Sequence, residues 1–367
     1  MASVRVSLAN HTYDVHVDRG LIPRAGDILR PLTQSKKIGI VTDDAVAAHY
    51  LAPLSASLEA AGFGPIPCIV PAGETHKTIT TVATICDTLL AHRWERTRPI
   101  IALGGGVIGD MTGFAAASIL RGVPFVQIPT TLLSMVDASV GGKTGVNAAA
   151  GKNLIGAFHQ PIAVLADVDT LATLPEREFI SGLAECIKHD VIRDANHFAV
   201  LEQSMDRIRS RDPALLVDLV AHNVAIKARV VEADPFERGE RAHLNFGHTF
   251  GHGIERASNY ALTHGECVGL GMVAAARAAT SLGMLDAKDA TRVEHLIAAA
   301  GLPTGGLKIG SDAVLTAMAS DKKVANAKLR FVLPDRIGHV VIRDDVPHDV
   351  VRGSLESLQG AGSSSVA

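Results

Sequence analysis

Cysteine is scarce in this chain of 367 residues, and its four cysteines are scattered, with no Cys-x-x-Cys pair. The spacing of Cys68, Cys86, Cys186 and Cys267 excludes a disulfide scaffold and a cysteine-based zinc site, and is typical of reduced thiols. The N-terminal residues, Met-Ala-Ser-Val-Arg-Val, lack the apolar core of a secretory signal. We therefore expect a cytoplasmic protein.

The chain also lacks a long apolar run and a strong excess of one charge. No uncharged apolar run reaches the roughly 18 residues that span a bilayer. The net charge of −3 gives no reason to expect nucleic acid or an anionic membrane as a partner. A hydrophobic content of 47% and a charged content of 20% are ordinary for a globular enzyme, and the length allows two domains.

Strand and helix patterns alternate in the first half of the chain. Residues 2–18 alternate apolar and polar side chains in two segments, which predicts an antiparallel hairpin. Helical patterns over 44–61, over 76–92 and from Met111 onward then separate apolar strand patterns. These strands are predicted at 37–42, 65–70, 100–103, 125–129 and 163–167. The alternation predicts an α/β domain over residues 1–175 with a mostly parallel, Rossmann-like sheet covered on both faces.

Beyond residue 175 the strand signals fade, and we expect a mainly α-helical domain over residues 176–358. Late extended segments are predicted only at 329–333 and 339–342. The last residues, 359–367, are small and polar, and we expect them to be disordered. Helical periodicity covers residues 176–209, 213–233, 242–259, 265–283 and 288–300.

A glycine-rich segment, Gly-Gly-Gly-Val-Ile-Gly-Asp110, follows the predicted strand at 100–103 and precedes the buried helix from Met111. Glycine lets phosphate oxygens approach backbone N–H groups, and a helix N-terminus favours an anion. A tight turn with close strand–helix packing explains the same residues. The spacing also differs from Gly-x-Gly-x-x-Gly, so the usual dinucleotide fingerprint is not met.

Histidines and one glutamate form a candidate metal site. His248 and His252 lie four residues apart in a stretch that reads as helical, so they share one face. His264 opens a His-Gly-Glu segment, and Glu185 lies in another helical pattern. One carboxylate and two imidazoles suit a catalytic zinc with open positions. Any single histidine is more often a structural residue, and no glutamate follows His248 in the His-Glu-x-x-His manner.

Several cations could contact an anion. Lys143 and Lys152 have glycine neighbours, which favours contact with phosphate over a solvated surface role. Lys188 follows Glu185 by three residues and shares its helix face, and Lys227 lies on a further predicted helix. We expect these groups in a cleft between the two halves of the chain.

Glu74 and Lys77 stand three residues apart at a strand-to-helix boundary. They form either an ion pair or a clamp for a ribose.

These segments, in this order, resemble the 3-dehydroquinate synthase family of the shikimate pathway, one of the sugar phosphate cyclases. The resemblance covers roughly residues 20 to 345. It rests on Pro-Ala-Gly-Glu-x-x-Lys77, Gly-Gly-Gly-Val-Ile-Gly-Asp110, Arg121-Gly, Pro-Thr-Thr131-Leu-Leu, Val-Asp137-Ala-Ser-Val-Gly-Gly-Lys143, Gly-Lys152-Asn153-Leu-Ile-Gly, Ala-Glu185-x-x-Lys188, Leu-Asn245-Phe-Gly-His248-Thr-x-Gly-His252, His264-Gly-Glu and Asp321-Lys-Lys323.

The resemblance implies a homodimeric lyase that uses NAD and a divalent metal, zinc or cobalt. Its substrate would be 3-deoxy-D-arabino-heptulosonate 7-phosphate, and its products 3-dehydroquinate and phosphate. Transient oxidation of the C5 hydroxyl by NAD makes the C6 proton acidic, so phosphate can leave. The ketone is then reduced again, the ring opens, and an intramolecular aldol reaction closes the carbocycle.

The resemblance also implies a role for each matching residue. The metal ligands would be Glu185, His248 and His264, with His252 in proton relay. Substrate phosphate or carboxylate would be held by Lys152, Asn153, Lys188 and Arg241, and by Arg121 from the partner subunit. The pocket would be lined by Asp137, Lys143, Lys227, Asn245 and one of Lys322 and Lys323, with Lys323 preferred. NAD contacts would come from Glu74, Lys77, Gly105, Gly106, Val107, Gly109, Asp110, Thr130, Thr131, Lys143, Lys152, Thr170 and Thr173.

The chain departs from the family pattern at one place. The family often has Asp-Glu-x-Glu where this chain has Asp234-Pro-Phe-Glu237. Proline fixes φ and removes a donor, which leaves the role of Glu237 open.

Three alternatives remain. A related cyclase would act on a different sugar phosphate, but Lys152, Asn153, Asn245 and His252 fit the dehydroquinate pattern. A metal-dependent polyol dehydrogenase would share the architecture and a similar glycine loop, but would not need the lysines. A non-catalytic binding protein would not need the ligand set.

Overall fold

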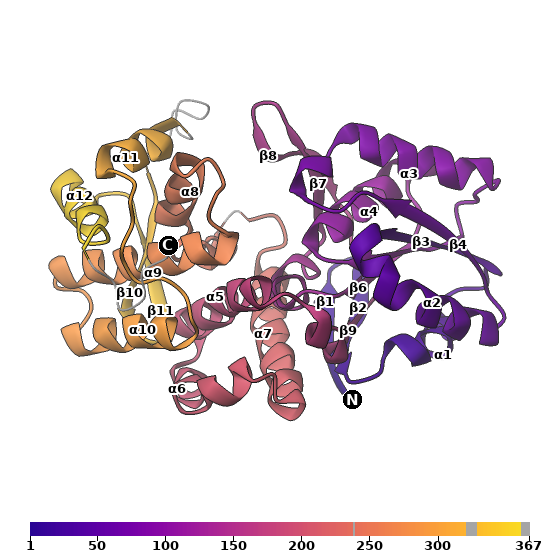
Figure 1. Ribbon diagram of the computed structural model, residues 1–367, viewed down its shortest axis with the longest axis horizontal. Helices are drawn as coiled ribbons and strands as arrows, with labels where there is room; N and C mark the ends of the chain where they lie inside the picture. The colour runs from indigo at the N-terminus through magenta and orange to yellow at the C-terminus, as the bar shows by residue number, and fades with distance from the viewer. Residues whose placement is uncertain (238, 321–328, 361–367) are drawn as a thin grey trace. The chain divides into compact units, whose positions relative to one another are not determined.

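The computed structural model describes residues 1–237, 239–320 and 329–360, and these form two compact units (Figure 1). The first unit comprises Met1–Leu174 and Pro213–Glu232, and the second comprises Pro175–Asp212 and the chain from Ala233 onward. Most of the predicted disordered tail, residues 361–367, lies outside the described residues. None of the described helices is long and apolar enough to cross a membrane.

Helix α7 (Pro213–Ala233) lies within the range expected for the second domain, but nearly all of it groups with the first unit. Its Lys227 ammonium lies 2.6 Å from Asp137 Oδ1, and Glu232 Oε1 accepts a 2.6 Å hydrogen bond from the backbone N–H of Ser7. These contacts hold α7 to the α/β part of the chain, a long-range pairing that helical periodicity does not reveal.

The first unit is built on a seven-stranded sheet of order β1-β2-β9-β6-β5-β3-β4. Only the β1–β2 pair is antiparallel. Strands β5, β6 and β9 are buried along their whole length, which is typical of a parallel sheet covered on both faces. The predicted hairpin and mostly parallel sheet are thus confirmed. The strands are β1 (Ala2–Leu8), β2 (His11–Asp18), β3 (Lys37–Asp43), β4 (Gly64–Val70), β5 (Ile100–Gly104), β6 (Phe125–Pro129) and β9 (Ala163–Asp167).

Helices cover both faces of this sheet. Along β5, Ile100 packs into one apolar cluster with Met111 of α4, whereas Ile101 packs into the other with Leu54 of α2. This alternation fixes which face each helix covers. The helical elements of the unit are η1 (Ile22–Arg24), α1 (Ala25–Leu29), η2 (Arg30–Leu32), α2 (Asp44–Ala60), η3 (Glu74–His76), α3 (Ile79–Ala91), α4 (Gly106–Ser118), η4 (Ile119–Arg121), the π-helical turn η5 (Ser134–Ala138) and η6 (Val168–Thr173), besides α7.

Helix α4 begins at Gly106, five residues before the predicted start at Met111, so most of the glycine segment is helical. Two glycines of the segment, Gly104 and Gly109, allow close packing. A Cβ at Gly109 would lie 2.7 Å from Gln127 Oε1, and a Cβ at Gly104 would lie 2.8 Å from Ile108 Cβ. Tertiary contact therefore overrides the low helix propensity of glycine.

An antiparallel hairpin of β7 (Lys143–Ala148) and β8 (Gly151–Phe158) was not predicted. Its strands contain glycines where two backbones meet, since a Cβ at Gly156 would lie 2.0 Å from the Thr144 carbonyl oxygen. Glycine within a strand weakens the sequence pattern even where it marks close backbone approach.

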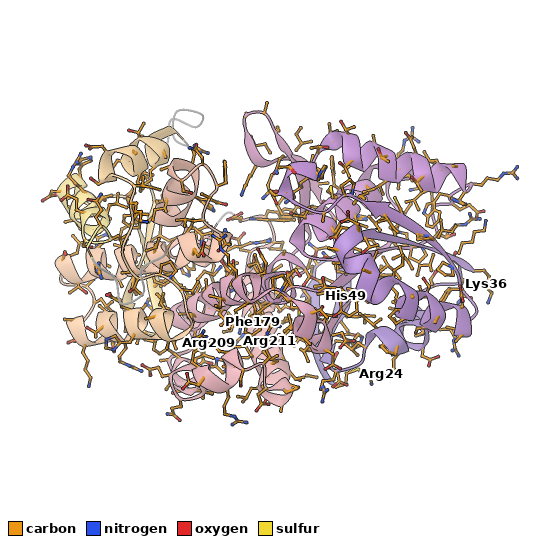
Figure 2. The ribbon with its side chains drawn as sticks, in the orientation of Figure 1. Arg24, Lys36, His49, Phe179, Arg209 and Arg211 are labelled. Carbon is orange, nitrogen blue, oxygen red and sulfur yellow. The ribbon has the colours of Figure 1, made fainter. Side chains whose placement is uncertain are left out.

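The second unit is mainly helical, as expected. Helices α5 and α9 form its buried centre. Arg211 stacks on the ring of Phe179 with its guanidinium carbon 4.9 Å from the ring centroid (Figure 2). Its elements are α5 (Glu176–Arg193), α6 (Ala195–Arg209), η7 (Glu240–Asn245), α8 (His248–Ala257), α9 (His264–Ser281), α10 (Ala287–Ala299), α11 (Ser311–Ser320), α12 (His348–Glu356), and the antiparallel pair β10 (Phe331–Arg336) and β11 (His339–Arg343).

Two predicted helices are each divided in the structure, and α11 and α12 were not predicted. Asp194 leaves the helical conformation between α5 and α6, and its side chain accepts hydrogen bonds from the backbone N–H groups of Asn196 and His197. Gly247 adopts a left-handed conformation with φ of 77°, which separates η7 from α8. Local side-chain capping and a single glycine thus interrupt a continuous helical pattern.

Candidate active site

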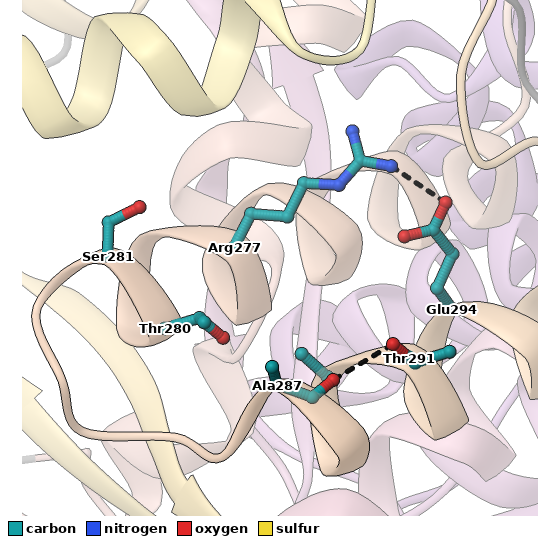
Figure 3. A pocket seen from close by; sticks show the side chains of 7 residues that line it. Arg277, Thr280, Ser281, Ala287, Thr291 and Glu294 are labelled. Atoms are coloured by element: carbon teal, nitrogen blue, oxygen red, sulfur yellow. Dashed lines mark hydrogen bonds and ion pairs between the residues drawn. The ribbon is translucent and has the colours of Figure 1, made fainter.

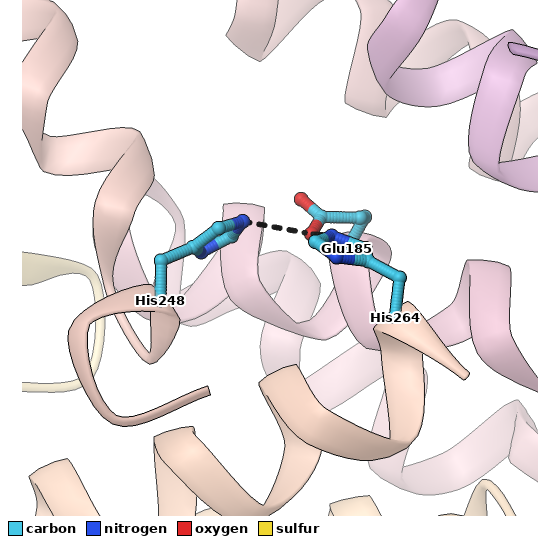
Figure 4. Close-up of side chains that lie close together, drawn as sticks. All are labelled: Glu185, His248 and His264. Carbon is cyan, nitrogen blue, oxygen red and sulfur yellow. Dashed lines mark hydrogen bonds and ion pairs between the residues drawn. The ribbon is translucent and has the colours of Figure 1, made fainter. Parts of the chain in front are cut away.

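Three side chains from three helices meet in the second unit (Figure 4). Glu185 is fully buried in α5, while His248 and His264 are the first residues of α8 and α9. Nε2 of His264 lies 3.3 Å from Glu185 Oε1, and Nε2 of His248 lies 3.5 Å from the same oxygen. One ligand atom from each residue lies within 4.8 Å of the others.

These distances fit a zinc ion. With bonds of about 2.0–2.2 Å, neighbouring ligand atoms of a tetrahedral site are about 3.3–3.6 Å apart. Complete burial disfavours a charged Glu185, yet the Lys188 charge and the hydrogen bond with His264 hold its carboxyl pKa well below the usual range. Burial lowers the pKa of His248 well below its usual value, so its imidazole is neutral and has a lone pair to donate.

The orientation of His248 is set by the residue that precedes the left-handed glycine. Nδ1 of His248 lies 3.1 Å from the Phe246 carbonyl oxygen. A proton on Nδ1 would be donated to that carbonyl, which leaves Nε2 unprotonated and facing Glu185. Fixing the tautomer through the second ring nitrogen is common among metal-binding histidines.

His252 is the alternative ligand that the four-residue spacing suggested. Its ring lies 5.2 Å from that of His248, but among the described residues no group suited to a metal contains both histidines. His252 instead groups with Glu255 and His264, and it is exposed, whereas Glu185 is completely buried. The geometry therefore favours the set with His264 and leaves His252 beside it.

The position of His264 is fixed by a helix cap that the sequence analysis missed. Thr263 and Glu266 form a capping box at the start of α9. Arg177 holds Glu266 through two hydrogen bonds of 3.0 and 2.8 Å, and Ser181 Oγ accepts a 3.0 Å bond from Gly265 N–H. The pattern Thr-x-x-Glu was readable in the sequence as a helix start.

Other predicted substrate residues of the second unit also have defined partners. Lys188 is 1% exposed, and its ammonium forms an ion pair with Glu185 Oε2. The angles of this contact are not those of a hydrogen bond. Arg241 is buried, and its guanidinium donates to the Pro235 carbonyl at 2.7 Å. Asn245 donates to Glu237 Oε1 at 3.3 Å, which gives Glu237 a structural contact despite the departure at Pro235.

In the first unit, the predicted NAD residues gather at the carboxyl ends of the parallel strands. Gly105 alone separates β5 from α4. Thr130 N–H donates to the Gly104 carbonyl at 3.0 Å, and a Cβ at Gly105 would lie 3.0 Å from Thr131 Cγ2. The first turn of α4 has no acidic side chain. A glycine cradle at the N-terminus of a 13-residue helix fits a pyrophosphate.

Lys77 forms an ion pair with Asp110 and not with Glu74. The structure therefore contradicts the interpretation of Glu74 and Lys77 as a simple ion pair. The Lys77 ammonium lies 2.5 Å from Asp110 Oδ2 and 2.5 Å from Asn153 Oδ1. Burial raises the pKa of Asp110, and the Lys77 charge opposes that rise. Glu74 Oε1 instead accepts a 2.8 Å hydrogen bond from Asn147, a residue that the sequence analysis did not single out.

The remaining predicted residues are divided between the units. Thr170 and Thr173 follow β9, and Tyr50 contacts Thr173 Oγ1 at 2.6 Å. Arg121 is exposed after α4, and Lys322 and Lys323 lie outside the described residues. The first unit contains Glu74, Lys77, Gly105, Gly106, Val107, Gly109, Asp110, Arg121, Thr130, Thr131, Asp137, Lys143, Lys152, Asn153, Thr170, Thr173 and Lys227, and the second contains Glu185, Lys188, Arg241, Asn245, His248, His252 and His264.

A surface hollow between α9 and α10 contains none of these residues (Figure 3). Arg277 lines it, but its guanidinium bonds Glu294 at 2.7 Å and the Ser357 carbonyl at 2.9 Å. Its cation is therefore already engaged by neighbouring groups.

Comparison with known proteins assigns both halves of the chain to one family. Residues 67–181 match the 3-dehydroquinate synthase N-terminal model, and residues 182–324 match the 3-dehydroquinate synthase C-terminal model. A 3-dehydroquinate synthase of Neisseria meningitidis serogroup C is 46% identical over 97% of this chain and 99% of its own length.

Solved structures of similar fold carry cofactors. ValA, a 2-epi-5-epi-valiolone synthase from Streptomyces hygroscopicus subsp. jinggangensis with NAD⁺ and Zn²⁺ bound, superposes with a TM-score of 0.88. It is 31% identical, over 96% of this chain and 98% of its own. A 2-deoxy-scyllo-inosose synthase complexed with carbaglucose-6-phosphate, NAD⁺ and Co²⁺ has a TM-score of 0.89 at 23% identity, over 97% and 100% of the two chains, and shows the same fold.

Proposed function

The chain belongs to the 3-dehydroquinate synthase family, and from that membership we propose that it converts 3-deoxy-D-arabino-heptulosonate 7-phosphate to 3-dehydroquinate and phosphate. The reaction is an elimination of phosphate followed by ring closure, so the enzyme is a carbon–oxygen lyase. The observation that carries the proposal is the grouping of Glu185, His248 and His264 in a chain that also has the glycine cradle after β5.

The residues present fit both cofactors. Glu185, His248 and His264 would hold Zn²⁺ or Co²⁺, which when bound polarises a substrate hydroxyl. The backbone at Gly105, Gly106, Val107 and Gly109, with Thr130 and Thr131, would hold NAD, which when bound accepts a hydride and returns it. The bound NAD⁺ and Zn²⁺ of the valiolone synthase, at 31% identity, support this assignment.

The chain's own residues supply charge and proton transfer. The buried Lys188 ammonium beside Glu185 would attract an anionic substrate group, as would Lys152 and Arg241. Lys227 is held by Asp137 Oδ1 at 2.6 Å and by the Asp137 backbone carbonyl, which fixes the position of its ammonium. His252 is exposed and lies next to the ligand histidines, so it is placed to relay a proton without binding metal.

Phosphate release tests the function. Purified protein with NAD and zinc should release phosphate from the heptulosonate without net formation of NADH, because the hydride is returned in the same turnover. A chelator should stop the release. Accumulation of NADH with simple polyols, and no phosphate, would support a dehydrogenase instead.

A second candidate is a cyclase for another sugar phosphate, which the 31% identity to a valiolone synthase favours. The 46% identity to 3-dehydroquinate synthases favours the first candidate. Supplying the heptulosonate and other sugar phosphates side by side decides between them, because only the true substrate should release phosphate at catalytic rates.

The family resemblance also supports a homodimer in which Arg121 serves the partner's site. Sedimentation velocity measures the mass directly. Mixing inactive R121A chains with inactive H264A chains should restore activity if the two subunits share residues, and no restoration would count against a shared site.

A further inference from the structure

A closed ring of hydrogen bonds in the first unit links two segments that have different predicted roles. Asn147 Nδ2 donates to Glu74 Oε1 at 2.8 Å, and Asn147 Oδ1 accepts from the Asn153 backbone N–H at 2.9 Å. Asn153 Oδ1 in turn accepts from the Lys77 ammonium at 2.5 Å. The ring closes because the Asn147 backbone N–H donates to the Lys77 carbonyl at 2.9 Å.

The ring holds Asn153 in an unusual conformation. Asn153 has a φ of 55°, in the left-handed region, although it lies within β8. Asparagine adopts this conformation more readily than most residues, but the conformation still costs free energy that the surrounding contacts offset. The Asn147 side chain supplies that hold through the Asn153 N–H, and the Lys77 ammonium supplies it through Asn153 Oδ1.

The side-chain amide of Asn147 meets two opposite demands. Its NH₂ group donates to a carboxylate while its carbonyl oxygen accepts from a backbone N–H. A carboxylate at this position would face Glu74 with a second negative charge, and an apolar side chain would leave the Asn153 N–H without its partner. The ring also reaches α4, because Lys77 contacts Asp110 at 2.5 Å.

We propose that Asn147 is a positioning residue that fixes the cofactor-facing pair, Glu74 and Lys77, and the substrate-facing Asn153 in one arrangement. The proposal rests on the proposed function for the roles of these three neighbours. It assigns to Asn147 no contact with either ligand. Its consequence is that one substitution should weaken the binding of NAD and of the sugar phosphate together.

Hydrogen exchange tests the geometry without any turnover. In N147A, the Asn153 amide should exchange at least tenfold faster than in the wild type, together with amides of residues 74–78. In N147D, the Asn153 amide should stay protected because the acceptor remains. Unchanged exchange at Asn153 in N147A would overturn the proposal.

A matched control separates positioning from mere stabilisation of the hairpin. Thr144 Oγ1 donates to the Ala157 carbonyl at 2.7 Å within the same hairpin, and it is outside the ring. T144V removes that bond at nearly constant volume. If N147A and T144V lower the melting temperature and the NAD affinity in the same proportion, Asn147 is only structural and the proposal is wrong.

Binding and kinetics complete the test. Calorimetric titration of NAD into zinc-loaded N147A should give a dissociation constant raised on the order of tenfold, and KM for the sugar phosphate should rise similarly, while T144V stays near wild type. Values within twofold of wild type for both ligands would overturn the proposal. Absence of phosphate release from the wild type would instead refute the proposed function, and the exchange and NAD measurements would still decide the role of Asn147.

Exchanging donor and acceptor in the Asn147–Glu74 hydrogen bond should partly restore NAD affinity. N147D places a carboxylate against Glu74, but in an E74Q background the side-chain amide introduced at that position can donate to it. The N147D substitution should therefore raise the NAD dissociation constant less in E74Q than in the wild type. An equal or larger rise in the E74Q background would contradict the Asn147–Glu74 contact as the positioning element.

Discussion

At the scale of single residues, the structure distinguishes between His252 and His264, which are both candidate metal ligands in the sequence. His264 lies 3.3 Å from Glu185 Oε1, whereas His252 is exposed beside it. H264A should lose bound zinc and phosphate release together. H252A should keep zinc but lose activity, because it removes only a proton relay. Metal analysis of the two purified variants checks this, and full zinc content in H264A would show that the ligand is wrongly assigned.

Lys188 carries the second residue-scale prediction, because it is buried against Glu185. Replacing it with methionine leaves the Glu185 carboxylate without its cation, which should cost about 3–5 kcal/mol of unfolding free energy in metal-free protein. Zinc would supply the missing positive charge, so the loss should shrink when metal is bound. Denaturant titration of K188M with and without zinc measures both values. An equal loss in the two states would mean that Lys188 does not share the metal's electrostatic role.

At the scale of the elements, helices α8 and α9 touch through glycine, and this contact holds two of the three ligands at their helix starts. A Cβ at Gly271 would lie 2.0 Å from the Gly247 carbonyl oxygen, which cannot move away without displacing His248. We expect G271A to destabilise the protein by about 3 kcal/mol or more and to weaken zinc binding.

Gly269, two residues earlier on α9, is the matched control. A Cβ there would lie 3.4 Å from Leu302 Cβ, an ordinary contact. G269A should be neutral or stabilise by up to about 1 kcal/mol through helix propensity. Thermal melts and zinc titrations of the pair test the argument, and similar behaviour of the two variants would contradict it.

The start of α9 gives a further element-scale prediction. Glu266 accepts from Thr263 N–H at 2.7 Å and from Arg177 at 3.0 and 2.8 Å. Its carboxyl pKa is lowered, since these bonds outweigh the burial that opposes ionisation. The stability they add is therefore present above the pKa of the unfolded glutamate, about 4.3, and is lost as the pH falls through the lower pKa of the folded state.

E266A should therefore lose about 1–2 kcal/mol near neutral pH and progressively less as the pH falls. E266Q keeps an acceptor for Thr263 N–H and should lose less. Urea titrations across the pH range measure this, and a loss in E266A that does not depend on pH would rule out the charged contribution.

Helices and strands with a clear pattern of apolar residues could be predicted from the sequence. Elements that depend on contacts with distant residues could not. The buried runs at 100–103 and 163–166 are apolar throughout, so their strands follow from the sequence alone. The β7–β8 hairpin was missed because its glycines serve backbone contact and not strand propensity. The early start of α4 was missed for the same reason, since Gly109 is selected by Gln127 and not by its own helix.

The candidate site shows the same division between local and distant information. Residue types and spacing pointed to Glu185, His248, His252 and His264 as candidate ligands, because ligand chemistry is carried by the side chains themselves, and the family resemblance favoured His264 over His252. Asn147 could not be found this way, since its partners Glu74 and Asn153 give no spacing pattern with it. A positioning residue is defined by geometry, and geometry appears only when the segments are placed together.

At the scale of the whole molecule, the residues proposed to hold the two cofactors belong to different compact units. The candidate metal ligands Glu185, His248 and His264 lie in the second unit, and the glycine cradle after β5 lies in the first. Each ligand should therefore protect mainly its own unit when added alone. Zinc should slow amide exchange at the starts of α8 and α9 and in α5, because it links three elements that each supply one side chain.

NAD without substrate should instead slow exchange in α4 and in residues 74–78. A ligand present at about 100 times its dissociation constant stabilises the folded state by about 2.7 kcal/mol, which is large enough to resolve by exchange.

With G271A as the variant, zinc protection of the second unit should be lost while NAD protection of the first unit persists. Protection by zinc that appears equally in α4 would show that the first unit takes part in the metal site, and that the two cofactor sites are not separable in this way.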